Sequence, residues 1–292
     1  MTNSLKIAAL ALPISLFAVS TQASPFTGPS EDYYLNNYSN NTIYVVQGSG
    51  VVQQFPWAYN NAQYSEGNLA LANGGIVTNG FGSQHGPLGI AGQYNFNGTP
   101  TGASHTAQET PGLGGGQIGE EQYDGTSDGV HNYTIDYGTG IVIQTDTNWQ
   151  NPTPIFNTRD LYGLGITYDR FNNSLWISDF GSLDDPGPGR IYDYSLSGTL
   201  LYQFSTDTSF VSALAFNAMD NTLWFSKDET NYLEQWSTNG VLLQAGIPAG
   251  LPTGKYLAGE IVPEPSSLAL LGISFIGIGF LAYRRRLPAL TA

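Results

Sequence analysis

Residues 166–178 read ITYDRFNNSLWIS, and residues 214–226 read LAFNAMDNTLWFS. The two stretches align at an offset of 48 residues, with an apolar run, a polar turn and a second apolar run at matching positions. A second pair, IYDYSLSGTLL at 191–201 and LEQWSTNGVLL at 233–243, aligns at an offset of 42 residues. The Asn-Asn or Asp-Asn pair of the first two stretches and the Ser-Gly or Asn-Gly pair of the second two favour tight hairpin turns. Each unit is therefore expected to hold four short strands, which predicts an all-β fold.

Glycines in similar contexts carry the repeat toward the N-terminus. Their spacings are 48, 42, 58 and 42 residues, and they are Gly50, Gly98, Gly140, Gly198 and Gly240. Four-stranded blades of a β-propeller repeat at about 40–50 residues. Residues 24–261 are therefore expected to form a β-propeller-like repeat domain of five or six four-stranded blades. A β-sandwich with two accidental repeats is the alternative fold.

Propellers usually close by building one blade from strands at both ends of the chain, which removes the open edge of the sheet. Here residues 256–261 are expected to pair with the segment near residues 42–46. The least regular stretch, residues 97–128, is expected to be a long solvated loop or a loop that covers a ligand.

Four aromatic residues recur at equivalent strand positions of the two clearest units. They are Tyr168, Trp176, Phe216 and Trp224. Such recurrence is what packing between blades requires, so these residues are expected to form the repeat core rather than a binding platform.

Composition narrows the function classes. The chain has 292 residues, of which 13% are aromatic and 36 are glycine, with a net charge of −14. The aromatic content argues against disorder, and the glycine content argues against a helical bundle. Nucleic-acid binding is not expected, because it requires clustered Lys and Arg. The absence of cysteine excludes disulfides, thiolate zinc sites and cysteine nucleophiles.

Residues 1–23 have the pattern of a signal peptide. Lys6 precedes an apolar run at 7–19, and the small-residue stretch at 20–23 allows cleavage after Ala23. A membrane anchor is the other interpretation, but a span requires about 20 apolar residues.

Residues 262–292 have three parts: Val262-Pro263-Glu264-Pro265, an apolar span at 268–283, and a basic cluster formed by Arg284, Arg285 and Arg286. The order predicts a single C-terminal transmembrane helix that stops at the arginines, because Lys and Arg resist translocation and stay cytoplasmic. Sixteen residues of helix cover about 24 Å, slightly less than a hydrocarbon core of roughly 30 Å.

This tail resembles the PEP-CTERM sorting signal of Gram-negative bacteria. The resemblance implies export, a membrane-anchored precursor held transiently in the inner membrane, and processing by an exosortase-type enzyme near residues 263–265. It also implies a final location in the cell envelope or outside the cell, often beside exopolysaccharide production.

The repeats, about residues 130–262, resemble a group of exported PEP-CTERM proteins with propeller-like repeats, and more distantly NHL and gluconolactonase-type propellers. The matching elements are GLGITYD at 163–169, LWISD at 175–179 and LEQW at 233–236. The closer group has no assigned activity, so this resemblance implies location and fold only.

Residues 24–262 carry five basic and 22 acidic residues, a net charge of −17. Such a domain repels anionic polymers. Its expected partners, besides the exosortase-type enzyme, are therefore a neutral exopolysaccharide or a divalent cation.

A catalytic motif is missing from the sequence. The three histidines, His85, His105 and His131, lie in no metal-binding or nucleophile-activating pattern. Our first interpretation is a non-enzymatic propeller scaffold of the cell envelope or extracellular matrix, associated with exopolysaccharide and biofilm, that needs no cofactor. The alternative is a divalent-cation-dependent propeller hydrolase or lactonase.

Carboxylates are the candidate ligands for such a cation. Asp179, Asp184 and Asp185 lie in or beside a Gly/Pro-rich loop, and Ca²⁺ takes oxygen ligands from such loops. A solvated acidic loop is the other interpretation. The gluconolactonase-type resemblance implies a cation on the propeller axis held by acids and Asn from different blades; Asp169 and Asn217 are placed either to reach the axis or to cap turns.

Replacing Arg284, Arg285 and Arg286 with Asn is expected to disturb membrane retention and processing of the tail, because the positive charges stop translocation of the span. Cell fractionation and the mass of the mature chain measure both effects. Unchanged fractionation and an unchanged tail length would contradict the sorting interpretation.

Overall fold

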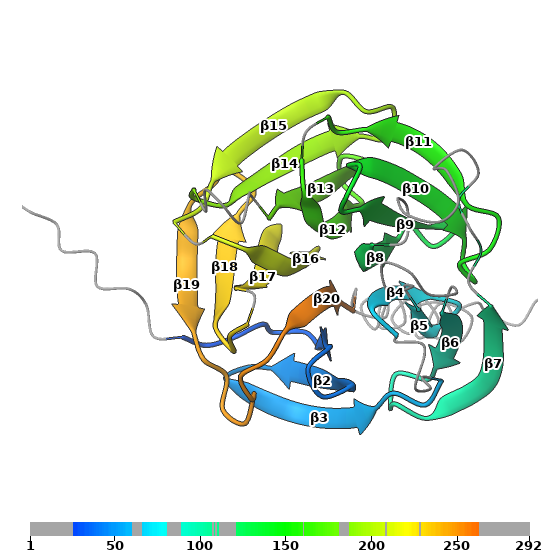
Figure 1. Ribbon diagram of the computed structural model, residues 1–292. Helices are drawn as coiled ribbons and strands as arrows, with labels where there is room; N and C mark the ends of the chain where they lie inside the picture. The colour runs from blue at the N-terminus through cyan, green and yellow to red at the C-terminus, as the bar shows by residue number, and fades with distance from the viewer. Residues whose placement is uncertain are drawn as a thin grey trace, which may run out of the picture.

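The computed structural model describes residues 26–59, 66–80, 89–106, 108, 110, 121–159, 161–180, 187–207, 209–227 and 229–262. Within these ranges, twenty strands form five four-stranded antiparallel sheets arranged around a central axis (Figure 1). The protein is therefore a five-bladed β-propeller, and the sandwich alternative is wrong. The predicted signal peptide, residues 1–23, and the tail beyond Val262 lie outside the described residues.

Blade 1 joins the two ends of the domain. It consists of β20 (Tyr256–Ile261), β1 (Tyr33–Asn37), β2 (Thr42–Gln47) and β3 (Gly50–Pro56), in that order across the sheet. The prediction that β20 closes the ring is confirmed. The prediction that it pairs with residues 42–46 is wrong, because β1 lies between them: Tyr33 pairs with Ile261 on one side and with Val46 on the other.

Blades 2 and 3 follow the chain from the axis outward. Blade 2 consists of β4 (Asn68–Ala72), β5 (Gly75–Asn79), β6 (Ile90–Tyr94) and β7 (Pro100–Thr106). Blade 3 consists of β8 (Gln122–Ser127), β9 (His131–Asp136), β10 (Ile141–Asp146) and β11 (Thr153–Asn157). The prediction of one long loop over 97–128 is therefore wrong at both ends, since β7 and β8 occupy them.

Blades 4 and 5 contain the two clearest repeats. Blade 4 consists of β12 (Gly163–Asp169), β13 (Ser174–Asp179), β14 (Arg190–Ser195) and β15 (Leu200–Ser205). Blade 5 consists of β16 (Val211–Asn217), β17 (Thr222–Lys227), β18 (Leu233–Ser237) and β19 (Leu242–Gly246). The innermost strands of the five blades are thus β20, β4, β8, β12 and β16 (Figure 1).

The turns of blades 4 and 5 follow the predicted repeat. Asn173 and Asn221 have φ values of 53° and 56° in the hairpins that follow the innermost strands of blades 4 and 5. Between the two outer strands, Gly98, Gly198 and Gly240 have φ values of 77–80°. We call the end of the propeller that carries these turns the hairpin face.

Two predicted turn glycines occupy other places. Gly50 begins β3, and Gly48 holds the positive φ of that turn, at 57°. Gly140 lies in the connection between β9 and β10, on the opposite end of its blade. The equivalent outer turn of blade 3 has no glycine and runs through Trp149 and Asn151 at φ values of 58° and 57°, so the irregular spacing of 58 residues arises here.

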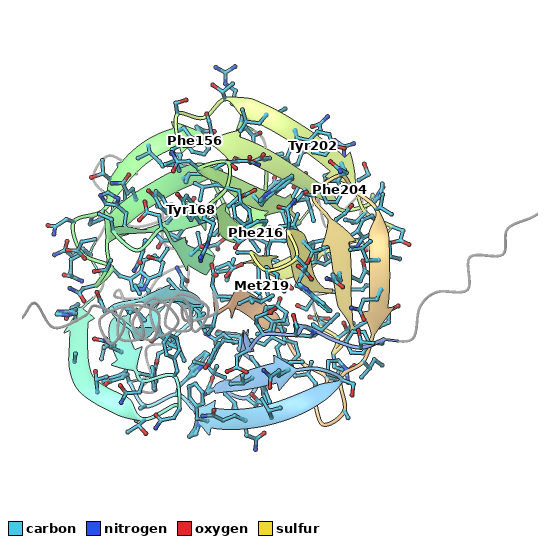
Figure 2. All side chains as sticks on the ribbon, turned by 180° about the vertical axis from the view of Figure 1, so that it is seen from behind. Phe156, Tyr168, Tyr202, Phe204, Phe216 and Met219 are labelled. Carbon is cyan, nitrogen blue, oxygen red and sulfur yellow. The ribbon has the colours of Figure 1, made fainter. Side chains whose placement is uncertain are left out.

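The outer-turn glycines have a second cause besides φ. A Cβ on Gly198 would lie 2.6 Å from the side chain of Phe156, and one on Gly240 would lie 2.7 Å from that of Phe204. Each phenylalanine belongs to the outermost strand of the preceding blade, as the labelled side chains in Figure 2 show. Phe55 and Gly98 repeat this contact between blades 1 and 2. Neighbouring blades therefore meet at their outer edges through an aromatic side chain on a glycine.

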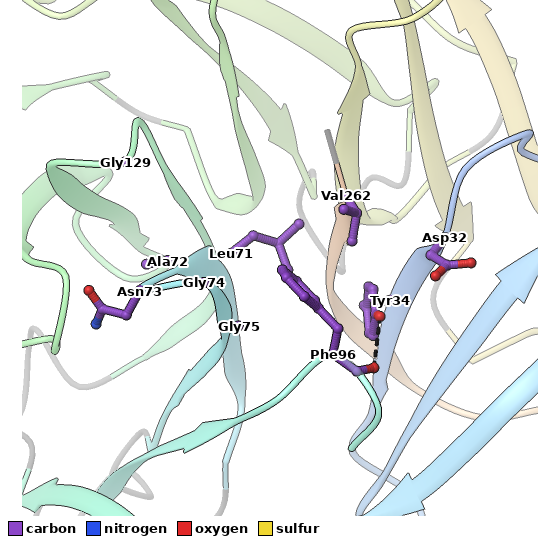
Figure 3. A pocket seen from close by; sticks show the side chains of 10 residues that line it. All are labelled: Asp32, Tyr34, Leu71, Ala72, Asn73, Gly74, Gly75, Phe96, Gly129 and Val262. Carbon is purple, nitrogen blue, oxygen red and sulfur yellow. Dashed lines mark hydrogen bonds between the residues drawn. The ribbon is translucent and has the colours of Figure 1, made fainter. Parts of the chain in front are cut away.

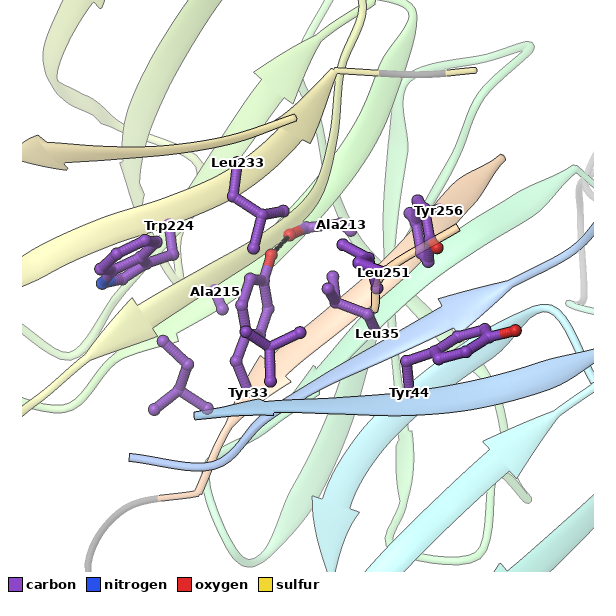
Figure 4. Close-up of a cluster of buried hydrophobic side chains, with 11 residues drawn as sticks. Tyr33, Leu35, Tyr44, Ala213, Ala215, Trp224, Leu233, Leu251 and Tyr256 are labelled. Carbon is purple, nitrogen blue, oxygen red and sulfur yellow. Dashed lines mark hydrogen bonds between the residues drawn. The ribbon is translucent and has the colours of Figure 1, made fainter. Parts of the chain in front are cut away.

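The predicted core residues lie between blades. Trp176 and Phe216 share a cluster between blades 4 and 5. Trp224 packs between blades 5 and 1 with Tyr33 and Leu35 (Figure 4). The side chains of these core residues from the repeats are at most 5% exposed.

Tyr168 is less buried than its repeat position predicts. Its ring stacks on Tyr133 with centroids 6.4 Å apart, and its hydroxyl donates to Asn173 Oδ1 at 2.8 Å. It therefore lies at the edge of the cluster between blades 3 and 4.

Substituting Trp176 or Trp224 with Ala is expected to lower the free energy of unfolding by about 3–5 kcal/mol each, because each leaves a cavity in a packed interface. Denaturant unfolding measures the loss. Phe171→Ala is the control, since that ring is 61% exposed. A loss below about 1 kcal/mol at either tryptophan would contradict the core assignment.

Candidate functional site

The carboxylate of Asp124 joins the innermost strands of four blades. Asp124 lies on β8 and is fully buried. Its Oδ1 accepts the backbone N–H groups of Gly125 at 2.8 Å and of Gly259, on β20, at 3.1 Å. Its Oδ2 accepts the N–H groups of Ile166, on β12, and of Leu214, on β16, both at 3.1 Å. One side chain thus satisfies backbone donors from blades 1, 3, 4 and 5.

Irregular pairing makes these donors available. The register of β12 shifts between Gly163 and Ile166, and that of β16 shifts between Ser212 and Ala215. β8 shifts likewise between Gln122 and Gly125, where Asp124 lies. An innermost strand also has no neighbour on its axial side, so its N–H groups there need an acceptor. Asp124 supplies it.

A second polar layer follows two residues further along the strands. Thr126 Oγ1 accepts the N–H of Tyr168 at 2.9 Å, and Thr167 Oγ1 accepts the N–H of Phe216 at 2.9 Å. Both threonine hydroxyls hydrogen-bond to the carboxylate of Glu260, which is 7% exposed. Oε1 of Glu260 has no hydrogen-bond partner among the described residues.

Burial sets the charge of this pair of acids. It raises the pKa of Asp124 well above its usual value, and the nearby Glu260 adds to the rise; the backbone donors act in the opposite direction because they favour the ionised form. Burial also raises the pKa of Glu260 well above its usual value, opposed by the two threonine hydroxyls and by Arg170. The four backbone donors of Asp124 require an ionised acceptor. We therefore expect Glu260, rather than Asp124, to be the protonated acid of the two.

Asp169 and Asn217, which the sequence placed either to reach the axis or to cap turns, cap hairpins. Asp169 Oδ1 accepts the N–H of Phe171 at 2.8 Å, and Asn217 Oδ1 accepts that of Met219 at 2.9 Å. The Nδ2 of Asn217 donates to the buried Glu31 at 2.6 Å. These bonds favour the turn-capping interpretation of Asp169 and Asn217.

The predicted calcium ligands are described only in part. Asp179 ends β13, paired with Gly163 and Arg190 on the adjacent strands. Asp184 and Asp185 lie outside the described residues, so the calcium site stays a prediction. Among the residues that the structure describes, no group of three His, Asp or Glu side chains could hold a metal ion.

The histidines are dispersed. His105 lies on the exposed outer strand β7 of blade 2. His131, at the start of β9, places Nδ1 3.5 Å from Asp128 Oδ2. His85 lies outside the described residues.

Sequence reasoning missed Asp124 and Glu260. The signal was present: each is a carboxylate inside a short strand segment, YDGT at 123–126 and LAGEI at 257–261, where a core strand is expected to be apolar. A buried acid in such a strand requires polar partners, and for Asp124 and Glu260 these lie on the innermost strands around the axis.

Comparison with known proteins identifies a sorting motif in the C-terminal tail. The model of the PEP-CTERM protein-sorting motif matches residues 262–286. No curated protein sequence matches the chain. Among the described residues there is no helix with the length and apolarity that a membrane crossing requires.

Solved structures show similarity of fold. A chain of a nidogen/laminin complex superposes with a TM-score of 0.51 at 12% identity, covering 79% of this chain and 97% of that one. Virginiamycin B lyase from Staphylococcus aureus has a TM-score of 0.44 at 14% identity, covering 75% of this chain and 71% of that one. Glutaminyl cyclase from Myxococcus xanthus has a TM-score of 0.43 at 14% identity, covering 72% and 75%.

The fold and the motif together define a class, that of β-propellers with a C-terminal sorting signal. This chain is an exported protein that is anchored to the membrane before an exosortase-type enzyme processes it.

Two isosteric substitutions on the axis are expected to have opposite effects near neutral pH. Asp124→Asn replaces an acceptor oxygen with a donor and leaves two buried N–H groups unsatisfied, a cost of about 2–5 kcal/mol. Glu260→Gln removes a buried carboxylate without removing a backbone partner, so it is expected to stabilise the fold. Denaturant unfolding at pH 7 measures both.

The pKa shift of Glu260 determines how the stability of the fold changes with pH. The folded pKa of Glu260 lies above its unfolded value, so the folded state binds more protons between the two. Its contribution to stability is present below the unfolded value and is lost as pH rises through the folded one. The advantage of Glu260→Gln over the parent is therefore expected to grow from pH 4 to pH 8. A constant difference would contradict this assignment.

Proposed function

We propose that the propeller is a non-catalytic scaffold of the cell envelope or extracellular matrix and that its partner there is a neutral exopolysaccharide. The sorting motif supports export and exosortase processing, and the proposal adds the destination and the partner. It includes no resident cofactor.

The observation that carries the non-catalytic assignment is the use of the axial carboxylate. A carboxylate offers about four lone-pair directions, and four backbone N–H groups occupy those of Asp124. Cation-dependent propeller hydrolases, by contrast, need several axial acids with free lone pairs, and the described axis offers only Oε1 of Glu260, with no group of three ligands around it. Here the most buried acid of the axis stabilises the ring.

Charge and exposed rings support the choice of a neutral polymer. The basic residues of the described propeller are spread over blades 4 and 5 and the connections on either side of them: Arg159, Arg170, Arg190, Lys227 and Lys255. Rings that are 37–61% exposed are spread over the surface: Tyr38, Phe96, Tyr162, Phe171, Tyr202 and Tyr232. Aromatic faces cover the apolar faces of uncharged sugar rings, while the net negative charge repels acidic polymers.

Electrophoresis in native gels containing polysaccharide tests the proposal. The full chain is expected to be retarded by neutral dextran or hydroxyethyl cellulose and not by anionic alginate. Replacing both Tyr162 and Phe171 with Ala is expected to reduce the retardation at least about twofold, since each ring offers a stacking surface. Val130→Ala, at an exposed non-aromatic position, is the control.

Two outcomes count against the proposal. Equal mobility in every gel would remove the polysaccharide partner. Tight, stoichiometric binding of one Ca²⁺, Mg²⁺, Mn²⁺ or Zn²⁺ in a calorimetric titration would favour the hydrolase interpretation instead.

A further inference from the structure

A cavity of about 720 Å³ opens between blades 1 and 2 on the hairpin face (Figure 3). Its position follows from its lining: Val262 and Asp32 flank the strands of blade 1, Gly74 lies in the first hairpin of blade 2, and Gly129 lies in that of blade 3. Sites for small molecules commonly measure about 300–1,000 Å³. The cavity is therefore large enough for an organic ligand.

The walls are mainly apolar. Leu71 and Phe96, from blade 2, lie opposite Tyr34 and Val262, from blade 1 (Figure 3). The Tyr34 hydroxyl donates to the backbone carbonyl of Phe96 at 2.9 Å, so the structure already uses this polar group. Phe96 remains 37% exposed, which leaves part of its ring free for contact. These walls suit a flat apolar or aromatic group.

Among the described residues of the lining, Asp32 is the one with a charged side chain. Its backbone carbonyl accepts the N–H of Val262 at 3.0 Å, which continues the pairing of β1 with β20 by one residue. Asp32 immediately precedes β1, and it lines the cavity together with Tyr34.

The described residues give the Asp32 carboxylate neither a hydrogen bond nor an ion pair. Partial burial raises its pKa, which is the effect of a carboxylate that loses water and gains no partner. The adjacent Glu31 differs, because Ser30 and Asn217 already donate to it at 2.5 Å and 2.6 Å. Asp32 is thus the acid at this cavity that a ligand can neutralise.

We propose that the cavity binds a small organic cation in which an aromatic or apolar ring is joined to a protonated amine. The ring contacts Leu71 and Phe96, and the amine donates to Asp32. The net negative charge of the domain raises the local concentration of cations and favours this ligand over a neutral or anionic one. This site shares Phe96 with the rings of the proposed polysaccharide surface but does not involve Tyr162 or Phe171, so different variants test the two proposals.

Three probes with the same ring test the charge requirement: tryptamine, tryptophol and indole-3-propionate. The full chain is held in lipid nanodiscs, and empty nanodiscs give the background for calorimetric titration. Tryptamine is expected to bind with one-to-one stoichiometry and about tenfold more tightly than tryptophol, which corresponds to one charge-assisted hydrogen bond. Indole-3-propionate is expected not to bind.

Matched variants locate the site. Asp32→Asn is expected to weaken tryptamine about tenfold and to leave tryptophol unchanged. Phe96→Ala is expected to weaken both probes by a similar factor, because both use the ring. Asp207→Asn and Leu243→Ala remove a carboxylate and an exposed apolar side chain away from the cavity lining and are expected to change nothing. Unchanged melting temperatures show that the variants are folded.

Three outcomes would overturn the proposal. In the first, tryptamine and tryptophol bind equally, or Asp32→Asn leaves tryptamine unaffected. In the second, the probes fail to bind the full chain in nanodiscs and also a chain that ends at Val262. In the third, only the shortened chain binds, which would make residues 263–292 the occupant of the cavity.

Discussion

The ring depends on one buried carboxylate. Five innermost strands converge on the axis, and each presents backbone N–H groups that have no strand on that side to accept them. Asp124 accepts such groups from β12, β16 and β20 as well as from its own strand. Because an unsatisfied buried N–H costs about 1–3 kcal/mol, the closure of four blades is coupled to this single side chain. Glu260 lies one layer away and contributes a second acid that must share the same apolar surroundings.

The outer edge of the ring is held by a different device. There the chain places a glycine in the last turn of one blade beneath a phenylalanine of the preceding blade, as in Gly198 with Phe156 and Gly240 with Phe204. The glycine serves two requirements at once, a positive φ and the absence of a Cβ. Polar contacts at the centre therefore join blades 1, 3, 4 and 5, and aromatic contacts at the rim join blade 1 to blade 2, blade 3 to blade 4, and blade 4 to blade 5.

The acids of the propeller differ in whether the fold already uses their carboxylates. Asp124 on the axis and Asp169 in a hairpin turn are engaged by backbone donors, so they serve the fold. Asp32 lies beside an apolar cavity and has no such partner among the described residues, so it remains available for a ligand. Val262, at the rim of that cavity, is also the residue where the sorting motif begins. The sorting motif thus begins on the hairpin face, beside the cavity.

The repeat spacing and the turn residues determined by themselves that this chain is a propeller, because hairpin chemistry is local: Asn173 and Gly198 act through their own φ angles. The sequence also indicated that the tail is a sorting signal, because a proline motif, an apolar span and arginines act as a linear signal. Only the tertiary structure decided the axis and the closure. Asp124 and Gly259 are 135 residues apart, and no local pattern records that one binds the other. The partner of β20 was equally open, because register between distant strands is set by packing across the ring.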